Sequence, residues 1–172
     1  MTRDDEYYMG LALDQARIAL ERGDFPVGCV IAQDGRVLAL GERQGTTDDR
    51  SFFSEIDHAE IRALKELENC SDHFEPEKAV LYVTMEPCLM CFAAIILSGI
   101  KKIVYAFEDP MGGGTKCDLT KLPPLYKNCD IKVIQEVGVL REESHKLFYN
   151  FFRKKDNKYW KDSLLENYVL SA

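Results

Sequence analysis

The chain has 172 residues, of which 46% are hydrophobic, so it can bury the core of one domain. No apolar run approaches the roughly 18 residues of a membrane span, and the first residues lack the pattern of a secretory leader, so we expect a cytoplasmic protein with no membrane partner. The net charge of −7 disfavours an extended nucleic-acid surface, although the segment 141–172 carries 7 basic and 5 acidic residues and is locally positive.

The first part of the chain is predicted to form a helix, a hairpin and a second helix. Apolar residues recur at helical spacing over 4–22 and again over 58–70. Two apolar runs, 27–32 and 36–40, flank the dipeptide Asp34-Gly35, which is typical of a two-residue hairpin turn. We therefore expect the first two strands to be antiparallel neighbours.

Three further strands and two helical segments follow. Apolar runs predict strands at 79–84, 101–107 and 131–136, and the first of these is apolar nearly throughout, as in a central strand. A helix is expected from about Cys88, and the segment 141–170 is largely helical, with a break around 156–157.

The alternation of strands and helices predicts one three-layer α/β/α domain around a mixed sheet of about five strands. We assign residues 1–155 to this domain and 156–172 to a C-terminal helical extension. The extension is amphipathic and carries Tyr159, Trp160 and Tyr168. It either packs on the core of the domain or closes over a pocket.

Two short motifs, each expected at a helix start, combine into a metal site. Cys88 and Cys91 follow Pro87, a residue favoured in the first helical turn, so both sulfurs lie on one face near the positive end of the helix dipole. Two cysteines alone also fit a redox pair, a disulfide or two core residues. His58 begins the other helix and supplies a third ligand, and Glu60 follows two residues later. Three protein ligands leave the fourth tetrahedral position open, as in catalytic zinc sites.

The motifs H-A-E at 58–60 and P-C-L-M-C at 87–91 resemble the signature of the cytidine deaminase superfamily. The similar branch contains tRNA adenosine deaminases and the guanine and cytosine deaminases. The resemblance runs from about Tyr7 to Phe152 and leaves out residues 156–172. It implies a cytidine deaminase-like fold and one Zn²⁺ per subunit, held by His58, Cys88 and Cys91.

The resemblance also implies an enzyme, a zinc-dependent hydrolase that replaces an exocyclic amino group by oxygen and releases ammonia. Zinc lowers the pKa of a bound water toward about 7. Glu60 is the natural general base, which takes the water proton and delivers it to the substrate. The resemblance further implies a homodimer through the helix that starts at Cys88. This helix has ten consecutive apolar residues, 88–97, which must be buried on more than one face of the helix.

Four residues are expected to contact the substrate. The resemblance implies that the backbone N–H of Ala59 binds the substrate. Met85, at the end of a strand, is expected to form a wall against the substrate ring. Asp109 matches an acidic position that faces the ribose in tRNA-editing relatives. In those relatives a basic residue precedes this position, whereas in this chain Glu108 precedes it. Arg43 stands where relatives carry an asparagine that contacts base or sugar. Arg43 either binds a carboxylate, phosphate or carbonyl group or lies on the surface.

The substrate is left open by the sequence. A small base, nucleoside or related heterocycle fits the acidic charge, Arg43 and the loop 41–57, which is longer than in relatives and carries Arg50, Phe52 and Phe53. The alternative is a tRNA wobble adenosine, with tRNA as the partner, which fits Asp109 and the basic tail. A catalytically silent zinc-binding subunit is a third hypothesis, and Glu60 argues against it.

Overall fold

The computed structural model describes residues 3–47, 53–70, 73–135 and 139–172. Within them, one mixed sheet has the strand order β2-β1-β3-β4-β5. β1 is antiparallel to β2 and to β3, whereas β3, β4 and β5 run parallel. The strands span Gly28–Gln33 (β1), Arg36–Glu42 (β2), Val80–Met85 (β3), Lys102–Phe107 (β4) and Lys132–Gln135 (β5).

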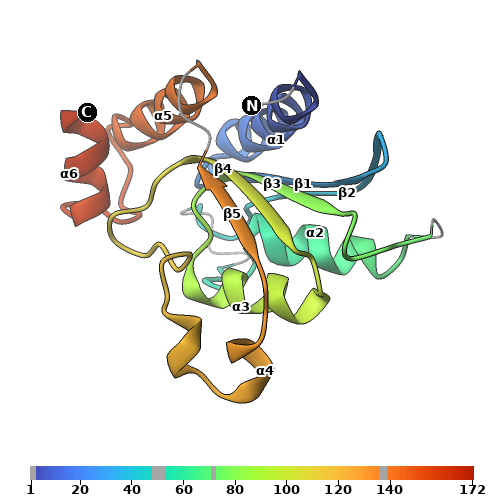
Figure 1. Cartoon of the computed structure of the whole chain (residues 1–172). Coiled ribbons are helices and arrows are strands. Elements are labelled where there is room, and N and C mark those ends of the chain that lie inside the picture. Colours follow the sequence, from blue (N-terminus) through green and yellow to red (C-terminus); the bar gives the residue numbers. More distant parts are fainter. Residues whose placement is uncertain (1–2, 48–52, 71–72, 136–138) are drawn as a thin grey trace.

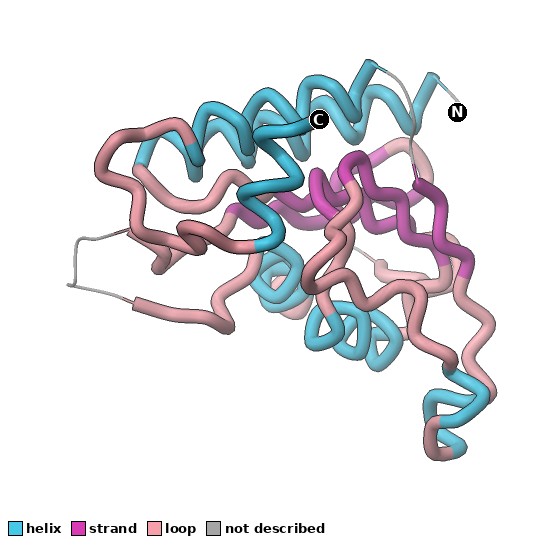
Figure 2. The backbone as a smooth tube through the Cα atoms, turned by 90° about the vertical axis from the view of Figure 1, so that its left-hand side faces the viewer, coloured by secondary structure: helices cyan, strands magenta, loops and turns pink. Residues whose placement is uncertain are grey.

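Helices cover both faces of this sheet, which confirms the predicted three-layer α/β/α architecture. α1 and α5 lie together on one face, α2 and α3 lie on the other, and α6 packs beside α5 (Figure 1). Figure 2 shows the sheet between the two helical layers. The helices span Arg3–Arg22 (α1), Ala59–Leu67 (α2), Leu89–Ser98 (α3), Pro124–Lys127 (α4), Val139–Phe152 (α5) and Leu164–Ser171 (α6).

The predicted hairpin and the predicted central strand at 79–84 are also confirmed. Asp34 and Gly35 have φ of 51° and 81°, the positive values that a tight hairpin turn of this hand requires. Every residue of β1 is buried, and β3 is buried from Leu81 onward. Both strands therefore lie in the middle of the core.

Two glycines set how closely the helices approach the sheet. A Cβ on Gly28 would lie 2.0 Å from the carbonyl oxygen of Ala12 in α1. A Cβ on Gly41 would lie 2.1 Å from the carbonyl oxygen of Ala59, the first residue of α2. Because His58 directly precedes Ala59, the contact at Gly41 also fixes the height of that histidine above the sheet.

Some element limits differ from those predicted. α2 ends at Leu67 instead of residue 70, and the connection before β5 contains a 3₁₀ turn at Leu119–Lys121 and α4, which the sequence did not suggest. The break in the C-terminal helical segment is longer than predicted, because α6 begins only after Ser163, whose hydroxyl accepts from the N–H of Glu166 at 3.1 Å. None of the described helices combines the length and apolar character needed to cross a membrane.

We predict that Gly41→Ala displaces α2 and damages the metal site. The clash is with backbone, so the cost lies at the upper end of overpacking, about 3 kcal/mol, which lowers Tm by roughly 6–12 °C. Thermal melts and metal analysis measure both effects. Gly10→Ala is the control, because a Cβ there meets nothing within 4 Å and alanine favours the helix. Equal Tm and metal content in the two variants would contradict this role of Gly41.

Candidate metal centre and pocket

The three predicted metal ligands meet at the start of two helices. His58 is the N-cap of α2 and Cys88 is the N-cap of α3, both with extended backbone conformation. Cys91 lies in the first turn of α3 and is buried. Both helix N-termini point their partial positive charge at the sulfurs, which stabilises thiolates.

The spacing of the ligand atoms fits zinc. His58 Nδ1 lies 3.6 Å from Cys88 Sγ and 3.5 Å from Cys91 Sγ. A tetrahedral ion with usual Zn–S and Zn–N bonds places nitrogen and sulfur roughly 3.5–3.6 Å apart. The hydrogen bond between the two thiols lowers the pKa of Cys88 and, together with burial, raises the pKa of Cys91, so the pair favours one thiolate over two neutral thiols. Metal binding requires the second thiol to lose its proton as well. The arrangement could hold Zn²⁺ and leaves room for a fourth, non-protein ligand.

Glu60 lies beside this triad with an oxygen to spare. Its side chain is 3% exposed, and burial raises its pKa above the usual range. Among the described residues, no group forms a hydrogen bond with Glu60 Oε2. A buried carboxylate oxygen with no partner is costly unless a proton or a bound water satisfies it. Glu60 is therefore placed to take and return a proton, the role expected from the sequence.

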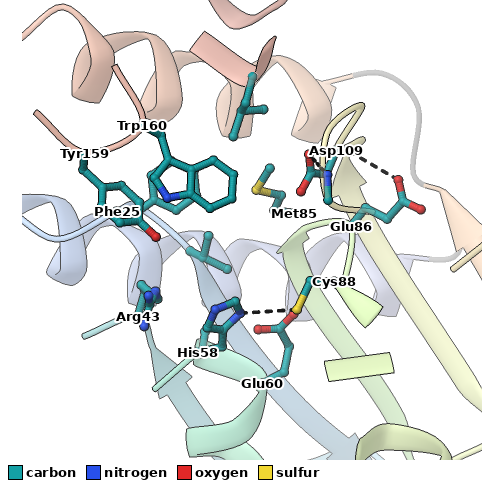
Figure 3. Close-up of a pocket in the computed structure, with 14 residues that line it drawn as sticks. Phe25, Arg43, His58, Glu60, Met85, Glu86, Cys88, Asp109, Tyr159 and Trp160 are labelled. Atoms are coloured by element: carbon teal, nitrogen blue, oxygen red, sulfur yellow. Dashed lines mark hydrogen bonds between the residues drawn. The ribbon is translucent and has the colours of Figure 1, made fainter. Parts of the chain in front are cut away.

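Two further carboxylates, those of Glu86 and Asp109, line the pocket beside β3. Figure 3 shows Glu86 and Asp109 together. Glu86 Oε2 accepts from the Asp109 N–H at 3.2 Å, and its other oxygen accepts from the hydroxyl of Thr115. Asp109 Oδ1 accepts from the N–H groups of Met111 and Gly112, both at 2.9 Å. These contacts fix the Asp109 side chain at the wall of the pocket.

The glycine-rich segment 112–114 packs against this site. A Cβ on Gly113 would lie 2.6 Å from the Glu86 carboxyl group, and one on Gly114 would lie 2.5 Å from the backbone nitrogen of Leu89. Gly113 also forms an antiparallel bridge with Cys88. The glycines therefore let this loop lie against the start of α3.

Arg43 is buried, so the surface alternative is wrong. Its side chain lines the pocket and the residue is 2% exposed. Nη1 donates to the carbonyl oxygen of Gln44 at 2.8 Å and Nη2 to that of Ser54 at 2.9 Å, and Nη2 lies 3.5 Å from Glu55 Oε2. These contacts hold the guanidinium group at the wall of the pocket. Arg50 and Phe52 of the same loop lie outside the described residues.

The C-terminal segment 156–172 contributes residues to the pocket, which was one of the two alternatives left open by the sequence. Tyr159, Trp160 and Leu165 line the pocket, and Figure 3 shows the two aromatic rings on the side opposite Glu60. The same segment also packs on the core, since Leu165 and Val169 are buried. Both options left open for this segment are therefore realised.

Phe25 and Val27 also line the pocket and were not predicted to do so. They precede β1, which runs antiparallel to β3, so they lie beside the end of β3 where Met85 is. The sequence does not reveal that β1 and β3 are neighbours. Ala59 and Met85 line the pocket as expected; all four predicted substrate residues are thus brought together.

Comparison with known proteins agrees with this geometry. Residues 2–107 match the family described as the cytidine and deoxycytidylate deaminase zinc-binding region. The chain is 35% identical over 150 residues to the tRNA-specific adenosine deaminase of Bacillus subtilis, covering 87% of this chain and 89% of that protein.

Two solved structures are similar as well. One comes from studies of A-to-I editing by tRNA:A34 deaminases; it has a TM-score of 0.62 and 33% identity, and the match covers 77% of this chain and 99% of that one. The other is a diaminohydroxyphosphoribosylaminopyrimidine deaminase/5-amino-6-(5-phosphoribosylamino)uracil reductase from Thermotoga maritima. Its TM-score is 0.63 at 32% identity, over 83% of this chain and 38% of that one.

We predict that Glu60→Ala retains zinc but loses turnover. Glu60 is not one of the three metal ligands, whereas the proton transfer expected of it is worth about 10²–10⁴-fold in rate. Metal analysis and ammonia release measure the two properties on the same preparation. Cys88→Ser is the matched variant and should lose zinc as well as activity. Substantial residual deamination by Glu60→Ala would contradict the assignment.

Proposed function

The chain belongs to the cytidine and deoxycytidylate deaminase family and uses zinc to deaminate a nucleobase or nucleoside, and from this premise we propose that it is a cytoplasmic deaminase of free, small heterocyclic bases. The observation that carries the proposal is the C-terminal segment over the pocket. In this proposal His58, Cys88 and Cys91 hold the zinc, and residues 156–172, which we call the cap, enclose the substrate.

The size and walls of the pocket support a single ring system. The cavity volume is about 70 Å³, well below the roughly 300–1,000 Å³ of pockets for drug-sized ligands. Phe25, Val27, Met85, Trp160 and Leu165 give it apolar walls. A base that is still part of a nucleic acid needs a mouth through which both flanking nucleotides leave, because such enzymes also contact those nucleotides.

The cap is held firmly enough to act as a wall. The ring of Phe25 lies 5.6 Å from that of Tyr159 and 5.2 Å from that of Phe148 in the core. Tyr159 in turn lies 5.6 Å from Trp160, and its hydroxyl donates to Glu55 at 3.1 Å. Aromatic contacts thus run continuously from the core to the pocket.

Polar groups in the pocket would orient the ring. Asp109 offers an acceptor for a ring or amino N–H, and Arg43 offers donors for a carbonyl oxygen. The first residue of a helix has an N–H with no intrahelical partner, so Ala59 can donate to the substrate as well. In this proposal Glu60 takes one proton from water and passes it to a ring nitrogen while the hydroxide forms a bond to the ring carbon. Glu60 then takes the second proton from the new hydroxyl group and passes it to the amino group, so that the C–N bond breaks, ammonia leaves and a C=O group remains.

A tRNA wobble adenosine is the second candidate, favoured by the identity to the Bacillus subtilis tRNA-specific adenosine deaminase. Asp109 lies in the pocket as this reading requires. The basic residues near the cap, which could face phosphates, are Arg153, Lys154, Lys155, Lys158 and Lys161. RNA would have to displace the cap to reach Glu60.

We predict that an ammonia-release screen finds a free base, and not tRNA, as the substrate. The panel contains adenine, guanine, cytosine, their nucleosides, pterins and unmodified tRNA, with Glu60→Ala as the blank. Release from one or more free bases, absent in the blank, is the expected result. Deamination of tRNA alone would contradict the proposal and establish the second candidate.

We also propose a homodimer through α3. Phe92, Ile95 and Ile96 face the core, whereas Leu89 and Leu97 are each 59% exposed. Leu97 adjoins a surface hollow that is also lined by Ile61, Leu64 and Phe74. An apolar helix face of this kind is normally covered by a partner.

We predict a mass of twice 19.7 kDa by light scattering at micromolar concentration, and a monomeric mass for Leu97→Glu, because a charge in the contact is costly. Ile18→Glu is the matched control, since Ile18 is similarly exposed on α1, on the other face of the sheet. A monomeric parent protein would contradict the dimer.

A further inference from the structure

A cluster of charged and polar side chains ties the cap to the rest of the domain. Glu108 follows β4 and accepts hydrogen bonds from Nε of Arg141 at 2.9 Å, from Nη2 of Arg141 and from the hydroxyl of Tyr168. Arg141 belongs to α5 and Tyr168 to α6. The cluster therefore joins the sheet, the helix next to it and the last helix of the cap.

The carboxylate of Glu108 is charged at neutral pH. Burial raises its pKa, but the hydrogen bonds from Arg141 and Tyr168 outweigh that effect and lower the pKa to about 2. The guanidinium of Arg141 also lies 5.0 Å from the centre of the Phe107 ring. Charge-assisted hydrogen bonds of this kind are stronger than neutral ones, so the cluster is a firm attachment.

Neighbouring contacts place α6 over the pocket. His145 Nε2 bonds the carbonyl oxygen of Val169 at 2.7 Å, and its ring stacks on Phe107. One turn before Val169, Leu165 is 1% exposed and lines the pocket. Movement of α6 therefore changes the pocket directly.

The segment between α5 and α6 carries backbone strain. Trp160 and Asp162 have φ of 55° and 60°, in the left-handed region that non-glycine residues rarely adopt. Such conformations persist only when surrounding contacts hold them and often occur at ligand clamps and switches. The contacts around α6 therefore help to hold this strained segment in place.

We propose that Glu108 is a positioning residue that, with Arg141 and Tyr168, forms a latch for the cap. The latch sets the fraction of time for which Trp160 and Leu165 cover the metal centre, and substrate enters when the cap lifts. The inference rests on the proposed function in that the cap encloses a small base. The next residue, Asp109, lines the pocket, so the end of β4 presents one carboxylate to the cap and the next to the substrate.

Trp160 is the single tryptophan of the chain, so its fluorescence reports on the cap without any substrate. The variants are Tyr168→Phe, which removes one hydroxyl group, and Glu108→Gln, which removes the charge. Tyr7→Phe is the control, because Tyr7 lies on α1 and is 61% exposed. We expect acrylamide to quench Trp160 at least about twofold more efficiently in both variants, and not in the control, because the open population rises.

The rate at which the chelator pyridylazoresorcinol extracts zinc is the second readout. It should rise by a similar factor in both variants, because the cap covers the route to the metal. The effect of the double variant should be smaller than the sum of the two single effects, since both changes affect the hydrogen bond between Tyr168 and Glu108.

Parental quenching and extraction rates in Tyr168→Phe, with a parental circular dichroism spectrum, would overturn the latch. Neither readout needs turnover, so the latch can be tested independently of the proposal that the substrate is a small free base. Deamination of tRNA alone, together with increased quenching in Tyr168→Phe, would leave the latch standing and remove the small-base substrate.

Discussion

The structure depends on bringing one histidine nitrogen and two cysteine sulfurs together from different helices. Each N···S distance is 3.5–3.6 Å, which leaves little tolerance in the position of either helix. α2 and α3 lie on the same face of the sheet, and each starts with a ligand as its N-cap. Gly41 under α2 and Gly114 against the start of α3 are the close contacts that make this geometry feasible.

The same arrangement explains how catalysis and substrate selection are divided. The helix starts supply the ligands and Glu60, whose buried oxygen has no partner among the described residues. The opposite side of the pocket is made by aromatic and aliphatic side chains, including those of the cap. We therefore propose that the two helix-start motifs carry the chemistry and that Arg43, Asp109 and the cap select the substrate.

Local sequence signals predicted most of the fold and the metal ligands. Each of these signals lies within a few consecutive residues, so it could be recognised without tertiary information. They are the Asp34-Gly35 turn, the apolar runs of the strands, and the motifs at 58–60 and 87–91 where two helices begin. The contribution of Phe25 and Leu165 to the pocket could not be recognised in this way, because it follows from strand order and from where α6 docks. The latch was equally hidden, since Glu108, Arg141 and Tyr168 are far apart in the chain and meet only through packing.

The X-ray absorption spectrum at the zinc edge distinguishes an open metal site with three protein ligands from a closed one. An open site should show two sulfur neighbours at about 2.3 Å and two lighter neighbours, one imidazole nitrogen and one exchangeable oxygen, at about 2.0–2.1 Å. Replacement of His58 by alanine should remove the imidazole signal. A third sulfur or a second imidazole in the spectrum would mean a closed, structural site and would contradict the account.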